Sequence, residues 1–333
     1  MPAATVATGR DRRRSGPDTA PLARMTNRRL KLAVLLVGIP ATILAGWYAY
    51  GDIQQLDAPP LWALLPAGAA NLVALACFAR SWAVLIDDLV PRRTLDDAFY
   101  TSQLMKYTPV GGVAQALGQA ALARTDDVGM DRAATAMVVS KLTTVLAASL
   151  FGPVLAVSNS TLPGWVRVGL LLTPVVLVFG RRSLLAWALE RLRSVIARVP
   201  DHTVLPEPSR IWRSVGWGAG GLLASGTSFA CLAITAGLGV GWPQAISGFA
   251  LAWAVGFLVI PIPAGVGIRE AALGLLVAGN PSALLVSAVL IRGVAIATEA
   301  LLFARVRITS RLAARAGRPG SAAGPVGDSI GGD

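Results

Sequence analysis

The stretch VIPIPAGVGIREAAL, residues 259–273, interrupts an apolar region with helix-breaking residues and then adds two adjacent charges. Its two prolines remove backbone donors and block a regular helix, and its glycines let the backbone turn and approach a ligand closely. Irregular backbone at membrane depth persists only where it is buried in protein or lines a water-filled cavity. The stretch is therefore the first candidate for a binding site, and its candidate residues are Pro263, Gly265, Gly267, Arg269 and Glu270.

The composition of the chain is that of a membrane protein. Of its 333 residues, 54% are hydrophobic and only 14% are charged, and the mean hydropathy is +0.60. These values predict a polytopic helical membrane protein. The net charge of +12 comes almost entirely from arginines beside apolar segments. This pattern indicates cytoplasmic flanks on an anionic leaflet, and we expect no nucleic-acid partner.

The cysteines and the histidine exclude several kinds of chemistry. Cys77 and Cys231 both lie inside apolar segments, so neither a disulfide framework nor a CxxC metal site is expected. The one histidine, His202, lies in a polar loop between two prolines. We therefore expect no metal site, no cofactor and no catalytic residues. An intramembrane enzyme is the weakest of the functional hypotheses, because acid–base or nucleophilic catalysis would need such groups.

The apolar segments and their flanking charges predict the topology. Two broken segments, 95–123 and 242–279, cannot be simple spans, because the flanking arginines would then lie on the wrong side of the membrane. We interpret them as re-entrant hairpins, the first entering from the cytoplasm and the second from outside. The predicted fold is an all-α polytopic bundle of about six to eight transmembrane helices with two such hairpins in an inverted repeat. The predicted spans are 32–50, 60–79, 133–157, 165–180, 213–237 and 282–304.

This topology divides the chain into a membrane domain and two tails. We expect the membrane domain at 32–305, with repeat halves at about 32–157 and 164–305. Between the halves, 181–212 should form a cytoplasmic amphipathic helix and loop. Residues 1–31 and 306–333 are expected to be disordered cytoplasmic tails of a protein in the cell membrane.

Matching features in the two halves support the repeat. Pro109 and Pro263 are separated by the same 154 residues as the two cysteines. Each hairpin turns on Pro and Gly, and each is followed by a span with one basic residue, Lys141 or Arg292. Inverted-repeat transporters bind substrate where such broken helices meet. Chance similarity between Ala- and Leu-rich segments is the alternative. The first hairpin contributes the candidate residues Pro109, Gly111, Gly112 and Gln115.

The charged residues inside apolar segments have two interpretations. A basic side chain at the centre of a span costs roughly 2.5–3.5 kcal/mol on insertion scales. Structural alternatives are an Arg292–Glu299 ion pair along one helix face, a Lys141 that reaches the interface, and mutual neutralisation of Arg269 and Glu270. The functional interpretation is a cationic, partly hydrated cavity for an anionic headgroup, lined by arginine, lysine and half-helix N-termini.

Three stretches resemble a known family. They are KYTPVGGVAQALGQAAL at 106–122, PIPAGVGIREAAL at 261–273 and LLVSAVLIRGVAI at 284–296. Together they are similar to the flippase-like transmembrane domain of lysylphosphatidylglycerol synthases, over about residues 32–305. The family often has an acidic residue and an arginine where this chain reads Ser140-Lys141.

The resemblance implies a transport-like domain. In the synthases this domain is associated with moving aminoacylated phosphatidylglycerol between leaflets, and some relatives are attached to glycosyltransferases that use polyprenyl phosphates. The chain has room for neither soluble enzyme domain, so we expect no synthase activity. We predict a flippase or transporter for an anionic phospholipid or a polyprenyl-phosphate-linked headgroup. The alternative is a non-transporting scaffold that binds lipid for a separate synthase or glycosyltransferase. The oligomeric state stays open.

The topology predicts which side of the membrane each loop faces. Cysteines introduced at 279–282 should react with a membrane-impermeant thiol reagent from outside, because the second hairpin enters from that face. Labelling of these positions only from the cytoplasmic side would contradict the inverted repeat.

Overall fold

Long apolar helices form the body of the protein. The computed structural model describes residues 60–86, 90–107, 111–123, 130–175, 177–179, 206–258 and 268–316, and every regular element in these ranges is helical. Four helical stretches there are long and apolar enough to cross a membrane, and they coincide with the spans predicted from 60, 133, 213 and 282. They are α2 (Leu64–Ala83, after the short η1, Leu61–Ala63), α5 (Met130–Ala148) continued by η3 (Ser149–Phe151) and α6 (Gly152–Ser158), α9 (Pro208–Thr235) and α12 (Pro281–Ala316).

Shorter helices lie where the sequence predicts broken segments. In the first half they are α3 (Arg92–Gln103), η2 (Leu104–Tyr107) and α4 (Gly111–Leu122). In the second half they are α10 (Trp242–Leu258) and α11 (Ile268–Leu276). α3 packs against α4, and α10 packs against α11. A further short helix, α7 (Gly164–Leu171), follows α6 and begins an apolar stretch that is shorter than a full span.

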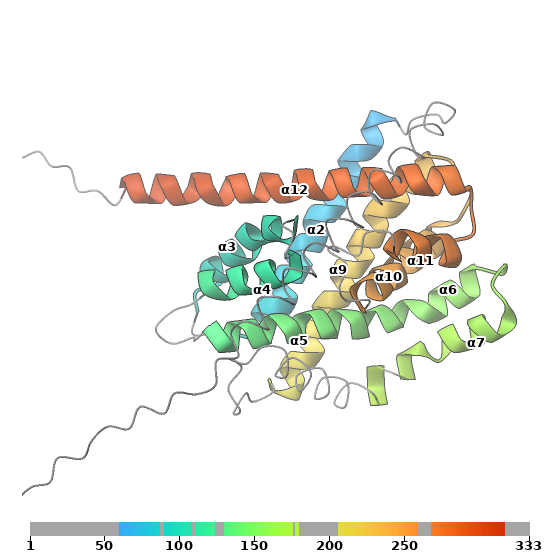
Figure 1. Ribbon diagram of the computed structural model, residues 1–333, viewed down its shortest axis with the longest axis horizontal. Helices are drawn as coiled ribbons and strands as arrows, with labels where there is room; N and C mark the ends of the chain where they lie inside the picture. Colours follow the sequence, from blue (N-terminus) through green and yellow to red (C-terminus); the bar gives the residue numbers. More distant parts are fainter. Residues whose placement is uncertain are drawn as a thin grey trace, which may run out of the picture.

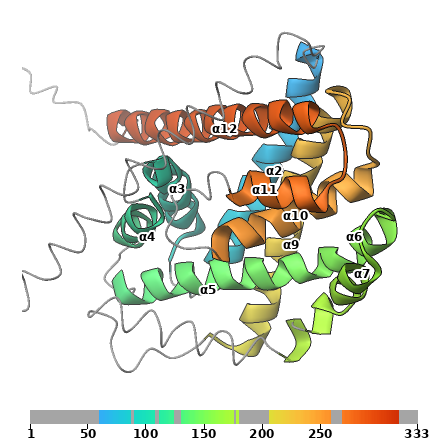
Figure 2. The same cartoon turned by 45° about the vertical axis from the view of Figure 1, so that its right-hand side comes forward.

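The four long helices form a crossed frame. α2 and α9 cross side by side between α12 and the α5–α6 rod, with α3 and α4 toward one end and α10 and α11 toward the other (Figures 1 and 2). α2 and α9 run antiparallel, since Arg210 at the start of α9 donates to the Ile86 carbonyl just after α2, whereas Ser228 donates to the Ala67 carbonyl near the start of α2. α5 and α12 also run in opposite directions (Figure 1).

Small residues on α9 allow its neighbours to approach closely. A Cβ built on Gly218 would lie 3.1 Å from the Thr144 Cα of α5, and one on Gly226 would lie 2.8 Å from the Ile246 carbonyl oxygen of α10. Without a hydrophobic driving force between helices in lipid, association depends on this close packing and on interhelical hydrogen bonds. α9 is accordingly the helix around which α2, α5 and α10 assemble.

Proline breaks the rod of α5 and α6, and a neighbouring side chain compensates. Pro153 has no N–H for the carbonyl four residues earlier, Ser149. The Thr173 hydroxyl donates to that carbonyl instead, at 2.6 Å. Gly152 leaves room for this approach, because a Cβ there would lie 2.5 Å from the Leu170 carbonyl oxygen. The end of α7 and the segment after it therefore pack against the rod at the proline break.

Loops without charged residues meet at one end of the frame. α9 ends in a Schellman motif, with Gly237 at φ +78° and the Leu238 N–H bound to the Ala233 carbonyl. The Leu238 carbonyl accepts from the Asn280 N–H at 3.1 Å. The Asn159 side chain donates to the Leu276 carbonyl at 2.9 Å. Hydrogen bonds thus join the loops after α6, α9 and α11.

The C-terminal end of α12 differs from the prediction. The segment from residue 306 is expected to be disordered, yet α12 continues to Ala316. Its last turns, RITSRLAARA, are rich in Arg, Ala and Leu, which are among the strongest helix formers, so local propensity extends the span beyond its apolar part. Other predicted segments lie outside the described residues: the tail 1–31, the span 32–50, most of the segment 181–212, and 317–333.

The close approach of α9 and α10 is testable with a matched pair of glycines. Gly226→Ala should destabilise the protein by about 1–3 kcal/mol, because its Cβ overlaps the Ile246 carbonyl, which is fixed backbone. Gly216→Ala, on the same helix with no atom within 4 Å, should be neutral or stabilising by up to about 1 kcal/mol. Thermal unfolding in detergent measures both. Equal melting temperatures for the two variants would contradict the packing described.

Candidate functional site

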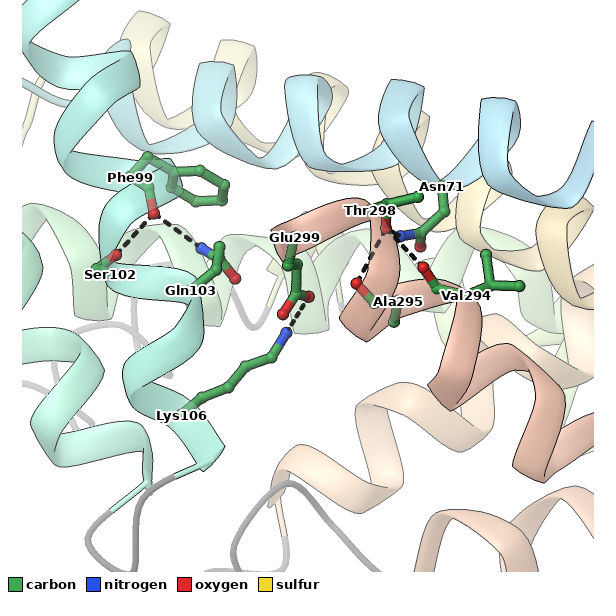
Figure 3. A network of polar contacts seen from close by, with 9 residues as sticks. All are labelled: Asn71, Phe99, Ser102, Gln103, Lys106, Val294, Ala295, Thr298 and Glu299. Carbon is green, nitrogen blue, oxygen red and sulfur yellow. Dashed lines mark hydrogen bonds and ion pairs between the residues drawn. The ribbon is translucent and has the colours of Figure 1, made fainter. Parts of the chain in front are cut away.

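Glu299 of α12 is the most deeply buried charged side chain of the candidate site. Only 2% of its side chain is exposed, and its Oε1 is bound by the Lys106 ammonium of η2 (Figure 3). Lys106 is the second residue before the break that follows Tyr107. The ion pair therefore attaches the end of η2, in the first half of the chain, to α12 in the second half.

Arg292, two turns earlier on α12, makes the second ion pair. Its Nη2 lies 2.7 Å from Glu270 Oε1, in the first turn of α11. Both side chains are partly exposed, 31% for Arg292 and 23% for Glu270. This pair holds the second broken segment to the same helix. The two segments thus meet α12 through charges of opposite sign, seven residues apart.

The structure corrects one pairing considered from the sequence. Arg292 and Glu299 do share one helix, but each is bound by a different partner on another element. Glu270, which was considered as a neutralising partner of Arg269, binds Arg292. Neighbouring helical residues do not face one another, so partners on other helices prevail.

Two further basic side chains contact aromatic rings. The Arg269 guanidinium lies 4.5 Å from the centroid of the Phe249 ring on α10. The Lys141 ammonium lies 6.0 Å from the centroid of the Phe78 ring on α2. Lys141 also interacts electrostatically with Lys106 and Glu299. It therefore faces the other helices of the bundle, which favours the functional interpretation over a side chain that reaches the interface.

Further polar side chains lie on the elements that meet at the Lys106–Glu299 pair. One residue before Glu299, the Thr298 hydroxyl accepts from the Asn71 amide of α2 at 2.6 Å (Figure 3). α4 packs against η2 and carries two buried amides one turn apart, Gln115 and Gln119. Neither Nε2 has a hydrogen-bond partner in the part of the chain that the structure describes, nor does Glu299 Oε2. Buried donors and acceptors of this kind are rare in native proteins and mark candidate ligand or water sites.

A network of hydroxyl groups holds α5 in place beside Lys141. Its neighbour Ser140 lies 3.2 Å from Ser81 of α2, measured between the hydroxyl oxygens. Ser81 and Thr143 both bond the Ser214 hydroxyl of α9, at 2.9 and 2.7 Å. All four side chains are buried. Interhelical hydroxyl bonds of this type join α2, α5 and α9 and hold the helix that carries Lys141.

The structure brings together some predicted site residues and leaves others undescribed. Gly111 and Gly112 begin α4, so the helix starts directly after the predicted break. The sequence interpretation missed Lys106 and Asn71, although both carried a signal: a polar side chain in or beside an apolar segment of a membrane protein marks function. Pro109, Pro263, Gly265 and Gly267 lie outside the described residues.

The family now follows from comparison with known proteins. The family described as "Lysylphosphatidylglycerol synthase TM region" matches residues 30–302. The chain belongs to this family. The match spans both broken segments, the first three long helices of the frame and the first part of α12. It agrees with the resemblance in the quoted motifs, which places the family's region at about 32–305. A search of curated protein sequences finds no match to this chain.

The Arg292–Glu270 pair should contribute measurably to stability. In a double-mutant cycle with Arg292→Met and Glu270→Gln, we expect a coupling energy of about 1–3 kcal/mol, because the 2.7 Å pair is partly desolvated. The same cycle on Arg92 and Asp96, an i,i+4 pair at 3.8 Å, should give about 0.3–0.5 kcal/mol. Unfolding in mixed detergent micelles measures both cycles. A coupling no larger than that of the control pair would contradict the assignment.

Proposed function

We propose that this protein moves an anionic lipid headgroup between the two leaflets of the cell membrane. The observation that carries the proposal is the pairing of both broken segments with α12 through buried or partly buried charges, Lys106–Glu299 and Arg292–Glu270. Ionisable groups inside apolar helices are costly, and in membrane proteins they mark substrate pathways or ion sites. Four basic side chains contribute to this region, namely Lys106, Lys141, Arg269 and Arg292.

The chemistry of these groups suits a phosphate-containing headgroup. Arginine presents a planar fork that binds phosphate through two hydrogen bonds, and lysine acts as a mobile point charge. α4 and α11 begin directly after the two breaks. Their N-terminal N–H groups are free of helical partners and carry the positive end of the helix dipole. The family's description names a phosphatidylglycerol lipid, which agrees with a phospholipid substrate.

An inverted repeat would supply the alternating access that transport needs. Both halves have the same order of elements: a long helix, two short helices around a break, and a second long helix. α2 and α9 run antiparallel, as do α5 and α12 (Figure 1). We propose that α3–α4 and α10–α11 are re-entrant hairpins that enter from opposite faces. In repeats of this kind, one half rocks against the other around a central site.

The distribution of charge supports the proposed orientation. The hydrogen-bonded loops 159–163, 237–241 and 277–280 contain no charged residue, as an outer face allows. The opposite ends of the same helices carry arginines, and we assign them and both tails to the cytoplasm. We assign the domain limits as predicted, with the membrane domain at about 32–305. We propose transport without catalysis. The arginines are Arg80, Arg132, Arg210, Arg213, Arg305, Arg307 and Arg311.

Reconstitution tests the transport function. The purified protein in liposomes should move fluorescent phosphatidylglycerol or a labelled polyprenyl phosphate to the opposite leaflet, measured by chemical quenching from outside. Arg292→Ala should slow this movement about tenfold or more, because it removes a charged contact near the break. Arg305→Ala, an exposed arginine four turns further along α12, is the matched control and should leave the rate unchanged.

The assay also separates transport from scaffolding. If wild type moves none of the tested lipids and equals Arg292→Ala, transport is ruled out for them. Retained binding of the same lipids would then identify a scaffold that presents lipid to a separate enzyme.

A further inference from the structure

We propose that the phosphate of the lipid headgroup binds Lys106 at the position that the Glu299 carboxylate occupies in the empty protein. The phosphate displaces the carboxylate from Lys106. The proposal rests on the proposed function for the class of ligand. It adds Lys106 as a binding residue. It also explains how headgroup binding would release the first broken segment from α12. Four observations carry it.

The first observation is the position of the pair. Lys106 lies two residues before the break at the tip of the first segment, and its side chain is 26% exposed. Glu299 is buried and projects from the middle of α12 toward it (Figure 3). The ammonium is therefore the accessible member of the pair. An incoming anion can reach Lys106 without first reaching the carboxylate.

The second observation is an excess of positive charge. Lys141 lies near enough to interact electrostatically with both Lys106 and Glu299. Two lysines and one carboxylate therefore interact electrostatically here. Other charges on elements packed against α12 have partners of their own: Asp96 of α3 interacts with Arg80 and Arg305, and Glu270 of α11 binds Arg292. The cluster is thus suited to an anion with more charge or more acceptor oxygens than one carboxylate offers.

The third observation is that the carboxylate is incompletely satisfied. Only Oε1 of Glu299 is bound, and within the described ranges Oε2 has no hydrogen-bond partner. A buried ion pair stabilises a protein only when its remaining lone pairs are also satisfied. The pair therefore lacks part of the hydrogen bonding that would offset the desolvation of Glu299, and a ligand with more acceptor oxygens can compete with the carboxylate for Lys106. A phosphate group, with several acceptor oxygens, can bind two lysines at once.

The fourth observation is the presence of spare donors beside the cluster. Gln119 accepts a hydrogen bond from Ser102, one turn before Lys106, through its Oε1 at 3.3 Å. This leaves its Nε2 buried, and that atom has no acceptor among the described residues. Gln115, one turn nearer the predicted break on the same helix, is also buried, and its Nε2 has no acceptor among the described residues. These two N–H₂ groups lie on α4, which packs against η2 and α5, the elements that carry Lys106 and Lys141, and such donors suit the acceptor oxygens of a phosphate.

The exchange has a structural consequence. While Glu299 holds Lys106, the tip of the first half is attached to the second half. A phosphate that takes Lys106 breaks that attachment and replaces it with its own contacts. Binding of the headgroup would then permit the two halves to move relative to one another, and the empty protein would remain closed by its own carboxylate.

Binding measurements with soluble lipids test the exchange directly. The probes are dihexanoyl phosphatidylglycerol, a phosphodiester, and geranyl phosphate, an isoprenoid monoester, with dihexanoyl phosphatidylcholine as the zwitterionic reference. Affinity is measured in detergent, below the micellar concentration of each probe, for wild type, Glu299→Gln and Lys106→Gln. Asp96→Asn is the matched control, because it makes the same charge change outside the cluster.

Opposite effects of the two variants are expected. Glu299→Gln should bind an anionic probe about tenfold more tightly than wild type, because the competing carboxylate is gone. Lys106→Gln should bind it about tenfold more weakly, and the double variant should match Lys106→Gln. Asp96→Asn and the phosphatidylcholine reference should show no change. The probe with the larger gain identifies the phosphate source, a glycerolipid or an isoprenoid.

Two results would overturn the exchange. One is a Glu299→Gln variant, folded by size-exclusion chromatography, that binds both anionic probes no better than wild type. The other is a Lys106→Gln variant with wild-type affinity, which decides the matter even if Glu299→Gln does not fold. Neither result depends on transport: a protein that fails the liposome assay yet shows the gain in binding keeps the exchange and loses only the flippase function.

Discussion

The structure depends on the compensation of two opposite charges placed seven residues apart on one apolar helix. Arg292 and Glu299 of α12 would each be costly to bury alone. Each is matched by a charge at the edge of a break in the backbone, Glu270 in one half and Lys106 in the other. The short helices of both broken segments pack against the long helices, and these pairs add a charged contact from each segment to α12. α12 is thus the common partner of two segments that lie far apart in the sequence.

The pairs form only because the surrounding helices are close enough. α9 supplies this closeness through glycines and serines that contact α2, α5 and α10. In lipid such contacts replace the hydrophobic effect as the source of association. The hydroxyl network of Ser81, Ser140 and Ser214 holds α5 in the register that turns Lys141 toward the Lys106–Glu299 pair. Packing of apolar and small residues therefore determines the electrostatics of the site.

The two ion pairs differ in a way that suits a moving protein. Arg292–Glu270 lies within the second half, between α11 and α12, and both of its members are partly exposed. Lys106–Glu299 joins the first half to the second, and one oxygen of its buried carboxylate has no hydrogen-bond partner among the described residues. The first pair links two helices of one half, and under the proposed transport the second pair is the contact that rocking of the halves would break. A site built on an exchangeable contact couples ligand binding to motion, because a ligand shifts only an equilibrium whose states it binds differently.

Membrane character, the apolar helices and the two breaks could be derived from the sequence, because hydropathy, proline and flanking charge act locally. The helices that start at Gly111 and Ile268 follow directly from the predicted breaks. The partners of the charges could not be derived. Lys106 and Glu299 are 193 residues apart, and the local candidate for Glu299 was Arg292 on its own helix. The tertiary structure decided this pairing, because long side chains bind whichever partner the packing of α9 and its neighbours brings within reach. The sequence determined which buried charges need a partner, and the fold determined which residue is that partner.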